Sequence, residues 1–235
     1  MIKVILWDVD NTLLDFEKAE YAAMQTCFQA FGLGKCSDEM LERYIKINKG
    51  YWEMLERGEI TKERLLVKRF EEFFALEGIK ADGCEEAFNE RYQKELGNAS
   101  AFCDGAWELV SSLKEEGRVK QYAVTNGTKV AQDGKLRKSR LIELFDDVFI
   151  SEVVGIEKPG IGFFDHVWNS IGRYPADEVM IIGDSLTSDM QGGNNAGILT
   201  CWYNPKGFVN TKELRIDWEI QHLNQVRDIL KNSCD

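Results

Sequence analysis

The sequence predicts an α/β protein, a doubly wound, Rossmann-like parallel sheet core with an inserted helical-bundle cap domain. Short apolar runs recur along the chain without a clean alternation of apolar and polar residues, as in strands that are buried on both faces. Helical stretches separate these runs, which favours parallel strands joined by crossover helices. The interval between the first two runs is much longer than the others and is helical throughout.

The first predicted strand covers residues 2–7, which are apolar and rich in β-branched side chains, and it ends at Asp8. The insert that follows, residues 16–98, contains enough apolar residues for a core of its own. We therefore expect it to form a cap over the ligand-binding edge of the sheet. Residues 1–15 and 99–235 would then form the catalytic core domain.

Roughly four helices are expected in the cap. The first covers about residues 16–31, the second follows Ser37, a good N-cap, and the third runs between Thr61 and Gly78. Apolar side chains at helical spacing identify the faces that these helices should bury. In the second helix they are Leu41, Tyr44, Ile45, Trp52 and Leu55; in the third, Leu66, Phe70, Phe73 and Phe74; in the fourth, Cys84, Phe88, Tyr92 and Leu96.

The remaining strands follow the cap. Apolar runs predict them at residues 121–125, 148–150, 179–182 and 198–203, and a closing strand and a C-terminal helix are expected within residues 210–235. In a doubly wound sheet the ligand lies beyond the carboxyl ends of the strands. The residues that follow each strand are therefore the first candidates for catalytic and ligand-binding roles.

The composition narrows the classes of partner. The chain has 40 acidic and 29 basic residues and a net charge of −11, which disfavours binding to a nucleic acid polymer. With only two histidines, a histidine-rich zinc site is improbable. The six cysteines include no CxxC pair, and we expect them to be reduced and mostly buried. No apolar stretch is long enough to cross a membrane. We expect a cytoplasmic monomer or homodimer without membrane contact.

Two carboxylates, Asp8 and Asp10, follow the first strand at a spacing that directs both side chains to the same side. Capping or turn formation alone could also explain them. An EF-hand loop beginning at Asp8 is excluded, because it requires glycine and glutamate where the chain has Leu13 and Ala19.

The second strand ends in Thr125, Asn126 and Gly127, a group suited to binding phosphate oxygens but equally typical of an N-cap turn. The next helix is rich in basic residues. This is typical of a solvated helix face, and we assign these residues no role; they are Lys129, Lys135, Arg137, Lys138 and Arg140.

Lys158 stands before a proline after the third strand, and Asp184 and Asp189 follow the fourth. Each signal is modest, but all of them fall at the same edge of a parallel sheet. Acidic groups so close together repel one another unless a cation joins them, which implies Mg²⁺. A metal, a lysine and the Thr125–Asn126 pair together form a receptor for a phosphoryl group.

These motifs resemble those of the haloacid dehalogenase-like phosphatases, in the branch with a helical cap after the first motif. DVDNT at 8–12, TN at 125–126, Lys158 and GDSLTSD at 183–189 carry the resemblance. The segments around residues 47–52, 151–159 and 192–204 are similar to the bacterial pyrimidine 5′-nucleotidases that act on noncanonical nucleotides. Arg140 departs from the pattern, since related sequences usually have glycine there; this concerns local geometry and not the site.

The resemblance implies a role for each motif. Asp8 would be the nucleophile that forms an aspartyl-phosphate, and Asp10 the general acid and base, with its backbone carbonyl on Mg²⁺. Asp184 would bind the metal directly, and Asp189 through water or by orienting Lys158. Thr125, Asn126 and Lys158 would neutralise the phosphoryl group. The metal set is then Asp8, Asp10, Asp184 and Asp189.

Two cap residues are candidates for substrate binding. Asn48 lies four residues from both Tyr44 and Trp52, so that it interrupts an apolar stripe. An amide that is satisfied between packed helices explains Asn48 equally well. Our hypothesis is that Asn48 and Trp52 contact the nucleotide.

The expected function is Mg²⁺-dependent hydrolysis of a small-molecule phosphate ester, a pyrimidine nucleoside monophosphate. A sugar-phosphate phosphatase or phosphomutase would share all four motifs and is the serious alternative. A 2-haloacid dehalogenase would not need the acids at Asp10 and Asp184. A non-enzymatic phospho-acceptor signalling module would be about half as long and would lack a cap.

Overall fold

A computed structural model describes residues 1–80 and 83–233 of the chain. Six parallel strands form the central sheet, in the order β3-β2-β1-β4-β5-β6. The strands are β1 (Val4–Trp7), β2 (Lys120–Thr125), β3 (Asp147–Ile150), β4 (Val179–Gly183), β5 (Leu199–Tyr203) and β6 (Trp218–Ile220). The predicted doubly wound α/β fold is confirmed, and the strands begin and end close to the predicted residues.

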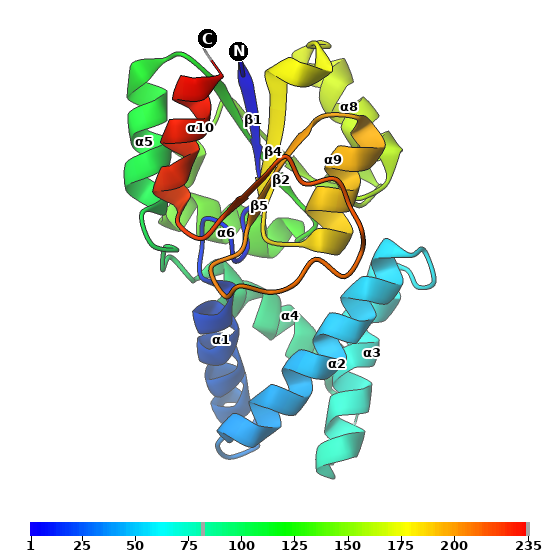
Figure 1. Cartoon of the computed structure of the whole chain (residues 1–235). Helices are drawn as coiled ribbons and strands as arrows, with labels where there is room; N and C mark the ends of the chain where they lie inside the picture. Colours follow the sequence, from blue (N-terminus) through cyan, green and yellow to red (C-terminus); the bar gives the residue numbers. More distant parts are fainter. Residues whose placement is uncertain (81–82, 234–235) are drawn as a thin grey trace.

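Helices cover both faces of this sheet (Figure 1). Those on one face are α5 (Ala106–Glu116), α6 (Lys129–Lys138) and α10 (Val226–Asn232), and those on the other are α8 (Ile161–Ile171) and α9 (Gln191–Ala196). The short elements are α7 (Ser151–Val154), η1 (Leu141–Glu143), η2 (Ala176–Glu178), η3 (Leu186–Met190) and η4 (Leu223–Gln225). Alternate residues of β1 enter opposite cores: Trp7 packs under α5, whereas Leu6 packs under α8.

The segment between β1 and β2 first forms a separate group of helices beyond the carboxyl ends of the strands (Figure 1). These are α1 (Phe16–Ala30), α2 (Asp38–Glu56), α3 (Lys62–Glu77) and α4 (Glu85–Gly97). The side chains of Asp15, Ser37 and Thr61 cap the first three helices by accepting a backbone N–H. A compact aromatic cluster fills the space between the helices, with Tyr44 stacked on Phe70 at 5.3 Å between ring centroids.

Two predictions about buried helix faces were wrong. Ile45 is exposed, because its neighbour Tyr44 takes the position that faces the aromatic cluster. In α3 the fully buried leucine is Leu65, while Leu66 is only half-buried. An α-helix has 3.6 residues per turn, so adjacent residues point in directions about 100° apart, and at these two positions only one of the pair faces the core.

Three further sequence predictions concern Arg140, the cysteines and membrane-spanning helices. Arg140 adopts a φ of 64°, the left-handed conformation that glycine favours, which agrees with its effect on local geometry alone. Cys27, Cys36 and Cys201 are buried as expected, and Cys234 lies outside the described residues. None of the helices in the described ranges is sufficiently long and apolar to cross a membrane.

Candidate active site

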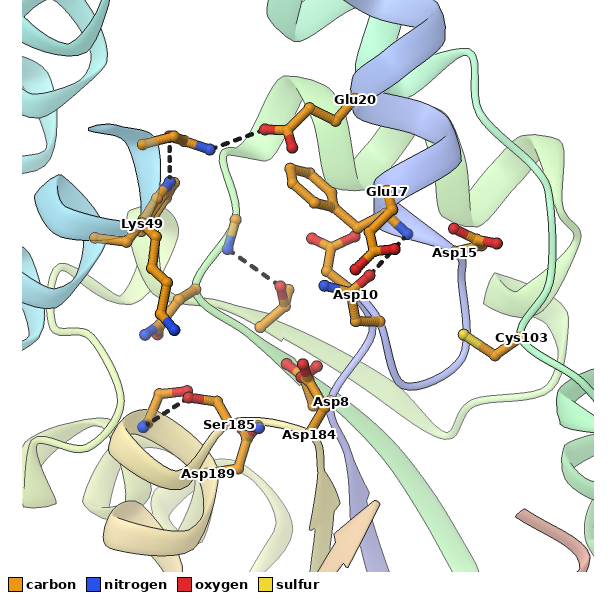
Figure 2. Close-up of a pocket in the computed structure, with 18 of the residues that line it drawn as sticks. Asp8, Asp10, Asp15, Glu17, Glu20, Lys49, Cys103, Asp184, Ser185 and Asp189 are labelled. Atoms are coloured by element: carbon orange, nitrogen blue, oxygen red, sulfur yellow. Dashed lines mark hydrogen bonds between the residues drawn. The ribbon is translucent and has the colours of Figure 1, made fainter. Parts of the chain in front are cut away.

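The candidate site lies where the carboxyl ends of β1, β2 and β4 meet helices α1 to α4 (Figure 2). A cavity of about 990 Å³ opens there, lined by loops of the sheet edge and by cap side chains such as Glu20, Trp52 and Arg69. The strand order reverses at β1, with β2 on one side and β4 on the other. Ligands of doubly wound folds bind at such switch points.

Lys158 is fully buried behind the wall of the cavity and joins two carboxylates that line it. Its Nζ donates to Asp8 Oδ1 at 2.9 Å, to Asp189 Oδ1 at 2.6 Å and to the carbonyl oxygen of Val124 at 2.7 Å. Burial lowers the pKa of Lys158, but Asp189 and Asp8 outweigh burial and the net pKa is raised. A fully buried lysine thus remains charged between the candidate nucleophile and the acid of the last motif.

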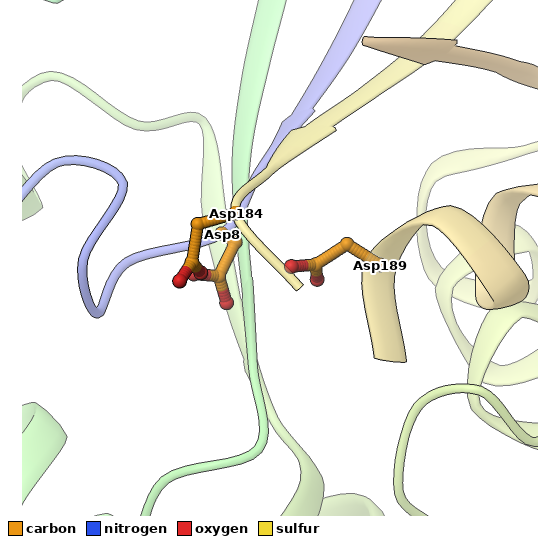
Figure 3. Close-up of side chains that lie close together, drawn as sticks. All are labelled: Asp8, Asp184 and Asp189. Atoms are coloured by element: carbon orange, nitrogen blue, oxygen red, sulfur yellow. The ribbon is translucent and has the colours of Figure 1, made fainter. Parts of the chain in front are cut away.

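Three carboxylates, those of Asp8, Asp184 and Asp189, have oxygens within 4.8 Å of one another. Asp8 and Asp184 extend side by side from neighbouring strand ends, and Asp189 points toward them from the η3 segment (Figure 3). Gly183 makes this possible, because a Cβ at that position would lie 2.2 Å from Asp189 Oδ2. The glycine in the GDSLTSD motif therefore leaves space for a buried carboxylate.

The electrostatics of this cluster fit a divalent cation. Burial, and then the charge of Asp189, raise the pKa of Asp8 to about 7, although Lys158 opposes the shift. Burial, and then Asp8 and Asp189, also raise the pKa of Asp184. A hard cation bound by the carboxylate oxygens would relieve this repulsion and favour the ionised forms, so the residues fit Mg²⁺.

Asp10 does not join the carboxylate cluster with its side chain. Its Oδ2 accepts a hydrogen bond from Gln132 Nε2 at 2.7 Å, and its Oδ1 accepts one from Lys135 Nζ, both from α6. Neither α6 residue was predicted at the site: the basic run that includes Lys135 was interpreted as a solvated face, and Gln132 was given no role. The helical spacing of Lys135 from Ala131, which is buried, was the signal that could have placed it inward.

Asn126 contacts Lys158, whereas Thr125 lies at the end of β2 on the lining of the cavity. The Asn126 amide forms two hydrogen bonds with the backbone of Lys158. Its Oδ1 accepts from Lys158 N and its Nδ2 donates to Lys158 O, each at 2.8 Å. Thr125 Oγ1 accepts a hydrogen bond from Gly127 N at 3.1 Å and lines the cavity. The structure thus brings Asn126 to the lysine backbone.

The two cap candidates, Asn48 and Trp52, both line the cavity. Asn48 is buried, and its Oδ1 accepts from Trp52 Nε1 at 3.1 Å and from Arg69 Nη1 at 2.9 Å. Its Nδ2 donates to Glu20 Oε1 at 3.0 Å. The Asn48 amide is therefore satisfied by protein groups, and it orients the indole ring that faces the cavity.

A cap lysine that sequence analysis missed contacts the core. Lys62, in the first turn of α3, donates to the Asn126 carbonyl oxygen at 2.9 Å and to Ser151 Oγ at 2.7 Å. It also forms an ion pair with Glu157 Oε1 at 3.0 Å. Burial lowers its pKa, although Glu157 opposes the shift. These contacts connect the cap to the loops that carry Asn126 and Lys158.

A parallel sheet with a helical insert after β1 and an acidic site at its carboxyl edge defines a class of hydrolase. The chain belongs to the haloacid dehalogenase-like hydrolases, whose family model matches residues 5–203. The resemblance noted from the four motifs is thereby confirmed.

Individual relatives cover nearly the whole chain. Pyrimidine 5′-nucleotidase PynA of Streptococcus pneumoniae is 36% identical over 97% of this chain and 94% of its own length. Pyrimidine 5′-nucleotidase YjjG of Escherichia coli is 28% identical over 96% of each. A crystal structure of YfnB of Bacillus subtilis, named as a HAD-hydrolase and bound to magnesium, superposes with a TM-score of 0.90. It is 35% identical and covers 97% of this chain and 98% of its own.

Proposed function

We propose that this protein is a Mg²⁺-dependent phosphomonoester hydrolase that acts through an aspartyl-phosphate on Asp8, with pyrimidine nucleoside 5′-monophosphates as substrates. The observation that carries the proposal is the position of Asp8. Its carboxylate lies at the end of β1, bonded to Lys158 and to Thr12 Oγ1 and beside Asp184. A carboxylate so fixed at the bottom of a cavity is suited to attack a phosphorus atom.

In the first half-reaction an Asp8 carboxylate oxygen forms a bond to phosphorus, and the bond from phosphorus to the ester oxygen breaks. Asp10 donates a proton to the leaving oxygen, which departs as an alcohol. The charge of Lys158 and the hydroxyl of Thr125 offset the negative charge of the phosphoryl group. Asn126 acts on Lys158, because both ends of its amide hold the lysine backbone.

In the second half-reaction water attacks the phosphorus of the aspartyl-phosphate. Asp10 takes the proton of that water, and the bond between phosphorus and the Asp8 oxygen breaks. Inorganic phosphate leaves, and Asp8 regains its carboxylate. Both proton transfers thus return Asp10 to its starting state, so that no net acid or base is consumed.

The carboxylates of Asp8 and Asp184 and the backbone carbonyl of Asp10 would hold Mg²⁺, with Asp189 bound through water or orienting Lys158. When bound, the ion offsets the negative charge of the phosphoryl group and of the carboxylates. The magnesium-bound YfnB structure supports the choice of Mg²⁺ as the ion. Lys158 then supplies the positive charge on the other side of Asp8.

Substrate choice is assigned to the cap, for which we propose the boundaries 16–98, with residues 1–15 and 99–235 as the core. The names of PynA and YjjG support pyrimidine nucleotides. Trp52 offers a ring for base stacking, and Glu56 Oε2 is buried without a partner among the described residues. A donor group of the nucleoside can satisfy that oxygen.

A phosphate-release screen over nucleoside monophosphates and sugar phosphates tests the proposal. We expect the highest kcat/KM with pyrimidine nucleotides, dependence on added Mg²⁺, and no turnover in Asp8→Asn with an unchanged circular dichroism spectrum. Hydrolysis without metal, or activity in Asp8→Asn, would contradict the mechanism. Equal rates on every ester would leave the mechanism standing and overturn the nucleotide assignment.

A further inference from the structure

We propose that Lys135 and Gln132 of α6 are positioning residues, which hold the Asp10 carboxylate where it exchanges protons with the leaving oxygen and with water. This inference rests on the proposed function, because it assigns a role relative to Asp10. The two α6 residues lie more than a hundred positions from Asp10 in the sequence and form part of neither the aspartate motifs nor the lysine motif.

Both oxygens of Asp10 are engaged by α6. Gln132 Nε2 donates to Oδ2 at 2.7 Å, and the Lys135 ammonium donates to Oδ1. The backbone of the Asp10 loop is held separately, by a hydrogen bond from Asn11 N to the carbonyl oxygen of Leu14 at 2.8 Å. The α6 side chains therefore determine the direction of the carboxylate and not the path of the loop.

Burial makes Lys135 an unusual residue for a surface helix. It is 1% exposed, whereas Lys138 on the same helix is exposed. Its Nζ lies 5.3 Å from the centroid of the Phe16 ring, and its ion pair in the described part of the chain is with Asp10. A buried ammonium is costly unless it is paired, so its presence beside Asp10 needs an explanation beyond helix solvation.

The Gln132 side chain fits beside Asp10 because a neighbouring residue, Gly127, has no side chain. A Cβ on Gly127 would lie 2.1 Å from Gln132 Nε2, so the glycine that follows Thr125 and Asn126 leaves the space for the amide. Gln132 Oε1 is buried and has no partner among the described residues, although Gln132 lines the cavity. An acceptor left open beside Asp10 is available to a hydroxyl of the substrate or to the attacking water.

The two proton transfers give this inference a specific signature. A nucleotide has a poor leaving group, so its release needs the Asp10 proton. p-Nitrophenyl phosphate releases a stable phenolate without that proton, but the aspartyl-phosphate it forms still needs Asp10 to activate water. Misplacing Asp10 should therefore slow both steps for the nucleotide and only the second step for the aryl phosphate.

The test compares Lys135→Met and Gln132→Leu with Lys138→Met, an exposed position of α6, at saturating Mg²⁺. We expect kcat for a nucleoside monophosphate to fall about tenfold to a hundredfold in the first two variants, with KM nearly unchanged. With p-nitrophenyl phosphate, rapid mixing should show a stoichiometric burst of nitrophenolate at the wild-type rate, followed by slow turnover. Lys138→Met should match the wild type throughout.

A loss of the burst in proportion to the nucleotide kcat would overturn the inference, because it would indicate general damage to the site. So would nucleotide turnover within twofold of the wild type in both folded variants. If Lys135→Met does not fold, Gln132→Leu decides, since it retains the buried lysine. A wild type that hydrolyses neither ester with Mg²⁺ would refute the proposed function itself, before any variant is compared.

Discussion

The four aspartates of the site differ in the groups that hold them. Lys158 is shared between Asp8 and Asp189, whereas Asp10 is held by α6 and is not part of the carboxylate cluster. Among the described residues, no lysine forms an ion pair with Asp184. Because its neighbours are also acidic, it is the position where a cation contributes most to neutralising the site.

A buried acid in the cap gives a prediction for pH. Burial raises the pKa of Glu20 from 4.5 to about 7, against the opposing hydrogen bond from Tyr92. The folded protein therefore binds more protons than the unfolded chain between these values, and Glu20 costs increasing stability as the pH rises through that window. Above about pH 7 the cost levels off.

Glu20→Gln retains an acceptor for Tyr92 and Asn48 and removes this cost. The variant should exceed the wild type in unfolding free energy, and this excess should be about 2 kcal/mol larger at about pH 8 than at about pH 5.5. Urea unfolding at both pH values measures this, with the exposed Glu90→Gln as the control. An equal difference at the two pH values would show that Glu20 does not titrate in this window.

Sequence reasoning at this scale succeeded where a residue follows a strand. Asp8, Thr125 and Asp184 could be placed together, because parallel strands end at one edge. Lys62 and Lys135 could not, since a lysine in a polar helix is normally solvated and its burial depends on which partner the fold brings to it. Their partners, Glu157 and Asp10, are distant in the sequence.

Two helices, α4 of the cap and α6 of the core, cross at glycines. A Cβ on Gly134 would lie 2.7 Å from the carbonyl oxygen of Gly97, so the backbones are in direct contact there. The crossing also positions α6, which carries Gln132 and Lys135. The packing of the cap on the core thus bears directly on the site.

Gly134→Ala should destabilise the protein by about 1 to 3 kcal/mol, because backbone atoms cannot give way to the added methyl group. Gly50→Ala is the matched control, since Gly50 lies within α2 and a Cβ there meets nothing within 4 Å. That variant should gain roughly 0.5 to 1 kcal/mol from helix propensity. Chemical denaturation measures both, and equal effects would refute the close contact.

Lys62 joins a helix of the cap to two loops of the core. Lys62→Met would remove the donor to the Asn126 carbonyl oxygen and the ion pair with Glu157, loosening the segment that precedes Lys158. We expect kcat to fall on the order of tenfold to a hundredfold. Lys68→Met, which removes only the surface pair with Glu71, should leave kcat unchanged. Equal kcat in both variants would show that the link is not needed for turnover.

The elements themselves were largely predictable, because apolar runs, N-caps and glycine stops are local signals. Ser37 and Thr61 cap the predicted helices, and each predicted strand is present. The errors at Ile45 and Leu66 arose where two adjacent apolar residues compete for one buried position. Local sequence shows that a helix is amphipathic, but tertiary packing decides which neighbour faces inward.

For the whole molecule, the net charge is −11, and three of the acidic side chains, Asp8, Asp184 and Asp189, meet in one buried cluster. A cation that binds the folded site and not the unfolded chain stabilises the fold by mass action. Added Mg²⁺ should therefore raise the melting temperature, and at a hundred times its Kd it should contribute about 2.7 kcal/mol.

Thermal unfolding in MgCl₂ against NaCl of equal ionic strength isolates this effect from general screening. Asp184→Asn should lose most of the Mg²⁺ response, whereas Asp165→Asn, a surface change on α8, should retain it. An identical rise in both salts would mean that the carboxylate cluster binds no specific ion. This measurement does not depend on turnover.

The position of the cap in the chain also determines the order in which parts of the protein can fold during synthesis on the ribosome. Val4 of β1 pairs with Lys120 and with Val179, so the central strand is synthesised long before either neighbour exists. At 5 to 20 residues per second the wait is roughly ten seconds. During that time the four cap helices emerge and can assemble, while the apolar segment VILW remains without a sheet to join.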